Sequence, residues 1–278
     1  MPRLPPGKHL GALTSFDTYP ADVQVALDQR LDEMRAAIGI GNPVVVQRIQ
    51  LDWRDLEPTS AAGVYDTAPL TEALDQFDGV DNNEYIFLLL ATVDSEGVEG
   101  VRPEDLMQTP YADDLLWQRF QALLQQAVIP ILLANERIFL FAIGNEPGSY
   151  IEQNPAELLP MANFLNQSRN FVHETIPDLA VGLTMDKIFV EIADASDVVI
   201  FNQYGLQSEL TSDFLTAIDT PQDFVTELRE RQSIFGLDRP FVIQELGMPS
   251  GWEHQTSFMG TNPDYAAQVL KVMMEELC

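Results

Sequence analysis

Short segments rich in Val, Ile, Leu and Phe alternate along the chain with longer segments whose apolar residues recur at helical spacing. Strands buried on both faces give continuous apolar runs, whereas helices that cover a sheet keep one polar face. The alternation therefore predicts repeated strand–helix units with parallel strands rather than hairpins. Seven strands are expected, over residues 8–17, 43–53, 84–94, 137–147, 179–185, 197–206 and 239–249.

Helix candidates lie between these strands, over residues 21–39, 112–128, 156–176 and 221–236, and a last one covers 262–278. Seven strand–helix units in series predict an α/β fold of the (β/α)8 TIM-barrel type, incomplete at the C-terminus, with 1–278 as a single catalytic domain. A doubly wound open sheet is the structural rival. It ranks lower because no G-x-G-x-x-G motif follows the first strand.

The chain is long enough for one large core, with 278 residues of which 46% are hydrophobic. Its 43 Asp and Glu residues against 15 Lys and Arg give a formal charge of −28. Such a charge repels phosphate backbones and anionic membrane surfaces, so neither nucleic acid nor a membrane is expected as a partner. Because the acidic residues are dispersed, they indicate a solvated surface, with adaptation to salt as a second interpretation.

Cysteine and hydropathy add little to the expected location. Cys278 is the only cysteine, which excludes an intrachain disulfide and a cysteine-based metal site. The first residues contain no apolar region of signal-peptide length, and no segment approaches the length of a membrane span. The expectation is a soluble protein, either cytoplasmic or secreted with its leader absent from this sequence, and the oligomeric state stays open.

Active sites of parallel barrels form at the carboxyl ends of the strands, so the candidate chemistry is expected there. Acidic, amide and aromatic side chains dominate these positions, and no Ser–His or Cys–His nucleophile pair is present among them. The candidates are Asp17, Asp52, Trp53, Thr92, Asp94, Asn145, Glu146, Asn202, Tyr204 and Glu245.

Two glutamates each follow an apolar strand directly and precede a Gly or Pro turn. Glu146 lies in "FAIGNEPG" and Glu245 in "FVIQELGMPSG". Either glutamate alone could cap a helix or pair with an arginine. Because they end strands four and seven, which face each other across a closed barrel, they are interpreted as a catalytic pair.

These motifs resemble those of the clan A retaining glycoside hydrolases. "GNEP" resembles the acid/base motif and "QELGMPSG" the nucleophile motif of that clan, and the likeness covers about residues 9–278. "VQRIQLDW" is similar to strand two of the cellulase-like members, and "FNQYG" to strand six. "VIQELGMPS" is also similar to the β-1,3-glucanase-like family, which usually has an aromatic residue where this chain has Met248.

The resemblance implies a double-displacement hydrolysis of β-glycosidic bonds in an oligo- or polysaccharide. Glu245 would attack the anomeric carbon, and Glu146, about 5 Å away, would protonate the leaving oxygen and then activate water. It also implies roles for Arg48 and Tyr204 beside the nucleophile, where a cation and a hydroxyl donor favour its ionised form. No cofactor and no metal are expected, and the partner is a carbohydrate substrate.

Three further residues are candidate substrate contacts. Asn145 is expected to donate to the sugar 2-hydroxyl, and Trp53 and Trp252 to stack on sugar rings. Structural roles stay open for several candidates: a turn residue for Asn145, a partner of a neighbouring carboxylate for Arg48, and rim packing for Tyr204 and the tryptophans.

Two other functions also stay open. A barrel without an eighth strand could bind carbohydrate without turning it over. A metal-dependent lyase or isomerase could use carboxylates as Mg²⁺ ligands, and its candidate ligands are Asp17, Asp52, Glu146 and Glu245. No acidic cluster has local spacing that suits a metal, so the glycosidase is the preferred interpretation.

Overall fold

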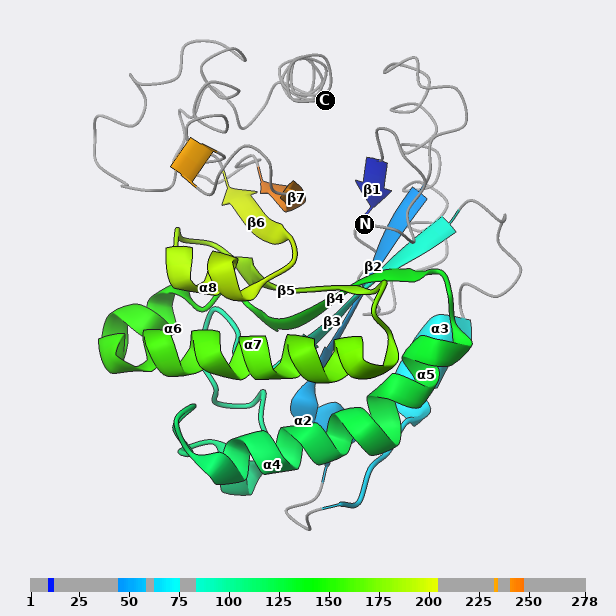
Figure 1. Ribbon diagram of the computed structural model, residues 1–278, viewed down its shortest axis with the longest axis horizontal. Helices are drawn as coiled ribbons and strands as arrows, with labels where there is room; N and C mark the ends of the chain where they lie inside the picture. The colour runs from blue at the N-terminus through cyan, green and yellow to red at the C-terminus, as the bar shows by residue number, and fades with distance from the viewer. Residues whose placement is uncertain are drawn as a thin grey trace, which may run out of the picture.

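The computed structural model describes residues 10–12, 45–58, 63–75, 84–204, 233–234 and 241–247. Within these ranges, seven strands form one sheet in sequential order, and every neighbouring pair is parallel (Figure 1). Each strand falls inside a segment expected from the sequence, which confirms the seven strands. They are β1 (Leu10–Ala12), β2 (Val45–Asp52), β3 (Glu84–Ala91), β4 (Ile138–Asn145), β5 (Ala180–Met185), β6 (Val199–Tyr204) and β7 (Phe241–Gly247).

The described helices are α2 (Trp53–Leu56), α3 (Ala68–Asp75), α4 (Asp114–Leu123), α5 (Ile129–Ala134), α6 (Gly148–Gln153), α7 (Leu158–Thr175) and α8 (Val190–Ala195). Two short 3-10 helices cover Glu104–Leu106 and Pro155–Glu157. The expected helices at 112–128 and 156–176 are confirmed. Those expected at 21–39 and 262–278 lie outside the described residues, as does the one at 221–236 except for residues 233–234, which are helical.

A π-helical segment, Leu124–Val128, joins α4 to α5. Pro130 stands in the first turn of α5. Its ring nitrogen cannot donate to the carbonyl four residues earlier, so an undisturbed α-helix could not continue through this point. The wider turn absorbs the misfit and lets one long helical unit cover the sheet.

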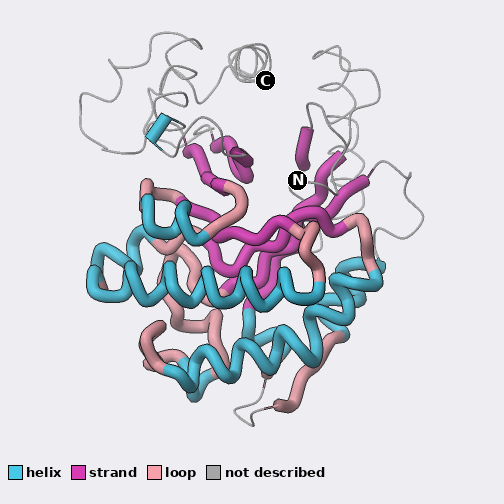
Figure 2. The backbone as a smooth tube through the Cα atoms, viewed as in Figure 1, coloured by secondary structure: helices cyan, strands magenta, loops and turns pink. Residues whose placement is uncertain are grey.

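Helices α2 to α8 lie on one face of the sheet (Figures 1 and 2). Successive strands are added on the same side, and right-handed crossovers then place every helix on the same face. Alternate strand residues, such as Ile86 and Leu88, pack against helix residues such as Phe120 in the larger apolar cluster. We call this the outer face.

The opposite face of the sheet, here called the inner face, is also apolar. Its cluster includes Phe87 and Leu89 of β3, Phe139 and Leu140 of β4, and Ile200 of β6, all at most 3% exposed. A parallel sheet covered by helices on one face, with a second core on the other, is the arrangement of a wall of a TIM-like domain. The structure therefore shows an α/β domain with a parallel sheet in barrel-like strand order.

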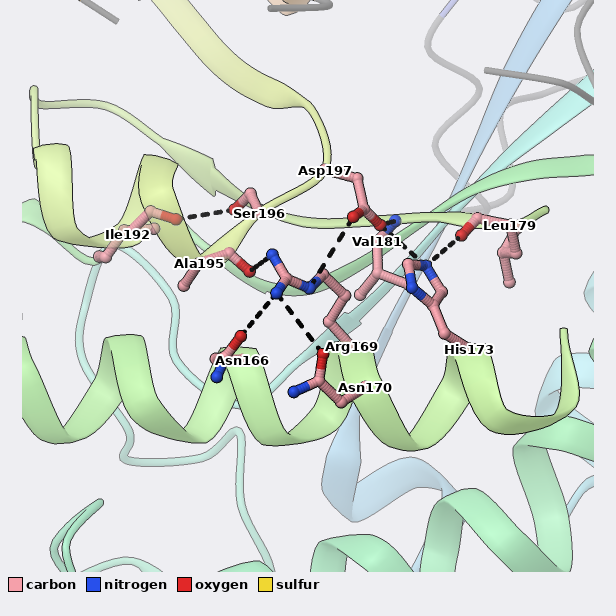
Figure 3. A network of polar contacts seen from close by, with 10 residues as sticks. All are labelled: Asn166, Arg169, Asn170, His173, Leu179, Val181, Ile192, Ala195, Ser196 and Asp197. Atoms are coloured by element: carbon pink, nitrogen blue, oxygen red, sulfur yellow. Dashed lines mark hydrogen bonds and ion pairs between the residues drawn. The ribbon is translucent and has the colours of Figure 1, made fainter. Parts of the chain in front are cut away.

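A polar network ties the amino ends of β5 and β6 to α7 (Figure 3). The Asp197 carboxylate accepts a hydrogen bond from the Val181 N–H at 2.9 Å, and His173 Nε2 lies 3.0 Å from it. Arg169 Nε lies 3.8 Å from the other oxygen, and its Nη1 donates to the Ala195 carbonyl at 2.9 Å. The network lies at the amino edge of the sheet, opposite the strand carboxyl ends, and it joins α7 to the sheet.

None of the described helices is both long and apolar enough to cross a membrane.

Candidate active site

The carboxyl ends of β2, β3, β4 and β6 bring five polar side chains into a connected group: Asp52, Asp94, Asn145, Glu146 and Asn202. Hydrogen bonds join Asn145 to Asp94 and Asn202 to Glu146. Asp52 is coupled electrostatically to Asp94. We call these five residues the edge group, and all of them were candidates from their positions at strand ends.

A bulge in β4 sets the direction of its last residues. The pairing with β5 shifts between Ala142 and Asn145, which places one extra residue in β4. Gly144 lies in this bulge with φ 122°. A Cβ there would lie 3.0 Å from Val93 Cγ1 and 3.2 Å from Leu183 Cδ1, so glycine suits both the conformation and the space. Bulges commonly re-aim side chains beside active sites, and this one precedes the "NEP" motif directly.

Glu146 adopts a left-handed backbone conformation, with φ 47°, the only positive φ of a non-glycine residue in the described part of the chain. Its N–H donates to the Thr184 carbonyl at 2.9 Å. Asn202 Nδ2 donates to Glu146 Oε1 at 2.7 Å. A residue with a Cβ gives up about 1–2 kcal/mol in this conformation, and such strain is concentrated at functional sites.

Asp186, directly after β5, fastens the turn that follows Glu146. Its Oδ1 accepts a hydrogen bond from the Gly148 N–H at 2.9 Å. A Cβ on residue 148 would overlap this carboxylate, so only glycine permits the contact. Burial raises the pKa of Asp186, and the hydrogen bond from Gly148 partly opposes this. Asp186 was not among the predicted site residues, although an aspartate directly after an apolar strand was a usable signal.

Asn145 is buried, with 6% of its surface exposed. Its Nδ2 donates to Asp94 Oδ1 at 2.8 Å, and its N–H donates to the Val93 carbonyl at 2.9 Å. Its Oδ1 is buried and has no hydrogen-bond partner within the described residues. The side chain therefore bonds to the neighbouring loop and not to its own turn, which sets aside the interpretation as a turn residue.

Asp52 ends β2 and is partly buried. Burial raises its pKa to about 6, and the charges of Asp55 and Asp94 add to the rise while Arg54 opposes it. Arg54 Nε lies 3.8 Å from Asp52 Oδ2. The Asp52 N–H donates to Asp55 Oδ2 at 2.8 Å at the start of α2. Two of the three charged side chains that shift this pKa are therefore negative.

Arg48 lies on β2, four residues before Asp52, and it is partly buried. Its register partner is Phe87, a member of the inner-face cluster. Registered residues of parallel strands share a face of the sheet, so Arg48 lies on the inner face. This is the face on which a barrel site would open.

Glu245 is the register partner of Asn202 in the pairing of β6 with β7. Neighbouring strands lie about 4.8 Å apart, so the backbone of Glu245 lies beside the residue whose side chain bonds Glu146. Tyr204 is similarly the partner of Gly247. For Tyr204 and Glu245 the description covers the backbone alone, and Trp252 lies outside the described residues.

The prediction that Trp53 stacks on a sugar is wrong. Its side chain is fully buried on the outer face, its ring packs edge-on against Phe120 at 5.0 Å, and its Nε1 donates to Glu57 Oε2 at 2.8 Å. Glu57 in turn pairs with Arg119 at 2.7 Å. The reason is the two-residue period of β2, since Ile49 and Trp53 fall on the helix-covered face.

The described residues contain no group of three or more His, Cys, Asp or Glu side chains that could hold a metal ion. Asp17, one of the candidate ligands, lies outside the described residues.

No protein-family model matches this chain, and no curated protein matches it by sequence. Solved structures do match it in fold. An exo-β-1,4-mannosidase from Opitutaceae bacterium strain TAV5 matches with a TM-score of 0.64 and 15% identity, over 96% of this chain and 50% of that one. A β-galactosidase from the psychrophilic Marinomonas ef1 matches with a TM-score of 0.59 and 12% identity, over 97% of this chain and 59% of that one.

A cold-adapted β-galactosidase from Rahnella sp. R3 matches with a TM-score of 0.57 and 12% identity, over 92% of this chain and 47% of that one. The chain thus spans about half the length of these proteins. At such low identity, the likeness is one of fold.

Proposed function

We propose that this chain is a catalytic domain of a retaining β-glycosidase, with Glu146 as acid/base and Glu245 as nucleophile. One observation carries the proposal: Asn202 donates to the Glu146 carboxylate and is also the register partner of Glu245. The two glutamates thus share one neighbour, although 99 positions separate them in the sequence. The strained backbone of Glu146 adds support. A glutamate that served only to interact with water would not need the unfavourable left-handed conformation at φ 47°.

The fold supports the same function by analogy. The matched solved structures are described as an exo-β-1,4-mannosidase and β-galactosidases. One fold can host unrelated activities, so the edge group is the main support for this function and the likeness of fold adds to it.

We further infer a barrel of the (β/α)8 clan A type, of which the described residues supply seven strands. The inner face of the sheet carries large apolar side chains, including Phe87, Phe139 and Ile200. Closure of the sheet on itself buries such a face, whereas a flat open sheet would leave it in water. Closure would also bring strands four and seven opposite each other, which the two-carboxylate chemistry needs.

The reaction needs two carboxyl groups about 5 Å apart with different tasks. Glu245 attacks the anomeric carbon and forms a glycosyl ester, while Glu146 gives its proton to the departing oxygen. Water then enters, Glu146 takes a proton from it, and the ester breaks with overall retention of configuration. Because Asn202 donates to Oε1 of Glu146, the transferred proton belongs on Oε2.

The remaining candidates have supporting roles. Arg48 lies on the inner face, where its positive charge favours ionised Glu245, and Tyr204 would donate a hydrogen bond to it. Trp252 stays a predicted sugar platform. No cofactor is required by this chemistry, and the substrate is an oligo- or polysaccharide whose sugar and linkage are open.

The test is turnover of an activated aryl β-glycoside by Glu146→Ala and Glu245→Ala. Each variant should lose about 10²–10⁴-fold in kcat, the usual contribution of such groups. Added azide should rescue both, giving the β-glycosyl azide with Glu146→Ala and the α-glycosyl azide with Glu245→Ala. Glu136→Ala is the control, because Glu136 is exposed just before the amino end of the same strand.

Failure of azide with both variants would refute the assignment of roles. Binding of β-glucans, mannans or galactans without turnover by the wild type would favour a carbohydrate-binding barrel. Activity that disappears on chelation would favour the metal-dependent alternative.

A further inference from the structure

Asp94 is held rigidly at the end of β3. Its N–H and carbonyl both bond to Gly97 at 2.7 Å, closing a tight turn in which Gly97 has φ 108°. The Ser95 N–H donates to Asp94 Oδ1 at 2.7 Å. The same oxygen accepts the hydrogen bond from Asn145 Nδ2 at 2.8 Å. The carboxylate is therefore fixed before any ligand arrives.

This contact decides which way the Asn145 amide points. An ionised carboxylate can only accept hydrogen bonds, so the amide nitrogen must face Asp94 and the amide oxygen must face away. The Asn145 N–H also donates to Val93 at 2.9 Å, so the backbone and the side chain of Asn145 both bond to the end of β3. The side-chain amide therefore cannot rotate without breaking the hydrogen bond from Nδ2 to Asp94.

The amide oxygen fixed in this way is buried and has no partner within the described residues. A buried acceptor without a donor costs about 1–3 kcal/mol, and such exceptions call for an explanation. A hydroxyl group of a bound ligand would supply the missing donor. The hydrogen bond to the Asp94 anion polarises the amide and makes its oxygen a stronger acceptor.

We propose that Asp94 is a positioning residue, which orients Asn145 so that its Oδ1 accepts a hydrogen bond from the sugar 2-hydroxyl. This inference rests on the proposed function. Asn145 directly precedes Glu146, which protonates the oxygen on C1, and the hydroxyl next to that bond is the one on C2. In this proposal Asn145 accepts the hydrogen bond, whereas the sequence-based expectation was that it donates one.

The direction of the bond matters for the rate. Positive charge develops at C1 in the transition state and makes the neighbouring 2-hydroxyl a better donor, so an acceptor placed there strengthens its bond as the reaction proceeds. Asp94 also lies close enough to Asp52 to raise its pKa, an unfavourable like-charge contact. A purely structural role would be served better by a neutral acceptor at position 94.

The experiment compares an aryl β-glycoside with its 2-deoxy analogue. In Asp94→Ala, kcat/KM for the 2-hydroxy substrate should fall about 10–100-fold, the range of one hydrogen bond to a charged or polarised group. For the 2-deoxy substrate it should fall by less than about 3-fold. Asp94→Asn keeps an acceptor without the charge and should be intermediate, and Asp94→Ala should add nothing in an Asn145→Ala background.

Glu96→Ala is the matched control, because Glu96 is an exposed carboxylate in the same turn. This variant should leave kcat/KM unchanged for both substrates. Equal losses on the two substrates in Asp94→Ala would make Asp94 merely structural and overturn the inference, while the proposed function would stand.

Absence of turnover in the wild type would instead defeat the proposed function. The same comparison would then be made in binding, with the methyl β-glycoside and its 2-deoxy analogue. A preference for the 2-hydroxy compound that disappears in Asp94→Ala would support the positioning role. A preference that persists, or is absent from the wild type, would overturn it.

Discussion

Replacing Glu146 by glycine should leave a more stable protein than replacing it by alanine, although both variants lose the same carboxylate. Each variant loses the hydrogen bond from Asn202 to Oε1, so that loss cancels in the comparison. What remains is the backbone, which holds residue 146 at φ 47°. The comparison therefore isolates the conformational strain at the proposed acid/base.

The magnitude follows from two opposing terms. A residue with a Cβ gives up about 1–2 kcal/mol in the left-handed region. Glycine has more freedom in the unfolded chain, which offsets about 0.4–1 kcal/mol of this advantage. Glu146→Gly should thus exceed Glu146→Ala by about 0.5–1 kcal/mol in free energy of unfolding, and Glu146→Asn should lie between them because asparagine tolerates this conformation.

The assay is urea unfolding at pH 7, followed by circular dichroism, for wild type and the three variants. Gln167 gives a matched control pair, since it is exposed in the middle of α7, where glycine should be less stable than alanine by about 1 kcal/mol. The glycine variant should therefore be the more stable one at position 146, and the alanine variant the more stable one at position 167. If alanine is at least as stable as glycine at position 146, the left-handed conformation and the strain argument are refuted.

Four further outcomes are expected. Asp52→Asn should raise the free energy of unfolding by about 1–3 kcal/mol at pH 7 and by nothing below about pH 4, because the raised pKa of about 6 makes the wild type lose stability as pH rises between these values. The melting temperature should rise between 0.1 and 1 M NaCl, because screening weakens the self-repulsion of a chain with formal charge −28. Trp53→Phe should cost about 1–2 kcal/mol, since Glu57 loses a buried donor, but should leave kcat/KM within about 2-fold. Asp197→Ala should cost about 2–4 kcal/mol in urea unfolding, since the Val181 N–H, Arg169 and His173 all lose the carboxylate beside them.

The first three of these have clear contradicting results. A stability difference for Asp52→Asn that does not change from pH 4 to 7 would mean that this carboxylate is solvated. A melting temperature independent of salt would mean that the acidic residues are too dispersed to repel one another. A large loss of kcat/KM in Trp53→Phe would mean that the Trp53 ring takes part in the substrate site after all.

The strands could be predicted from the sequence because β3 and β4 are buried on both faces and therefore form continuous apolar runs. The position of Trp53 could also have been predicted, since the period of β2 that places Arg48 inward places Trp53 outward. The short helices α6 and α8, of six residues each, could not, because one turn and a half carries too little periodicity.

The details of the candidate site were harder to predict than its location. The motif "GNEP" marked Asn145 and Glu146, but nothing in it indicates that Glu146 takes the left-handed conformation, because Gly144 beside it is the residue that usually does. The contact of Asp94 with Asn145 spans 51 positions and depends on the register of β3 with β4. Pairings of this kind are set by tertiary packing and leave no local pattern.

The two edges of the sheet differ in how their charges are compensated, and this difference supports the proposed location of the site. At the amino edge, Asp197 has His173 and Arg169 beside it and a backbone donor as well. At the carboxyl edge, Asp52 and Asp186 have raised pKa values, Glu146 is strained, and the buried Asn145 Oδ1 lacks a donor. A fold selected for stability alone would compensate both edges alike, so the less compensated carboxyl edge supports the proposed site there.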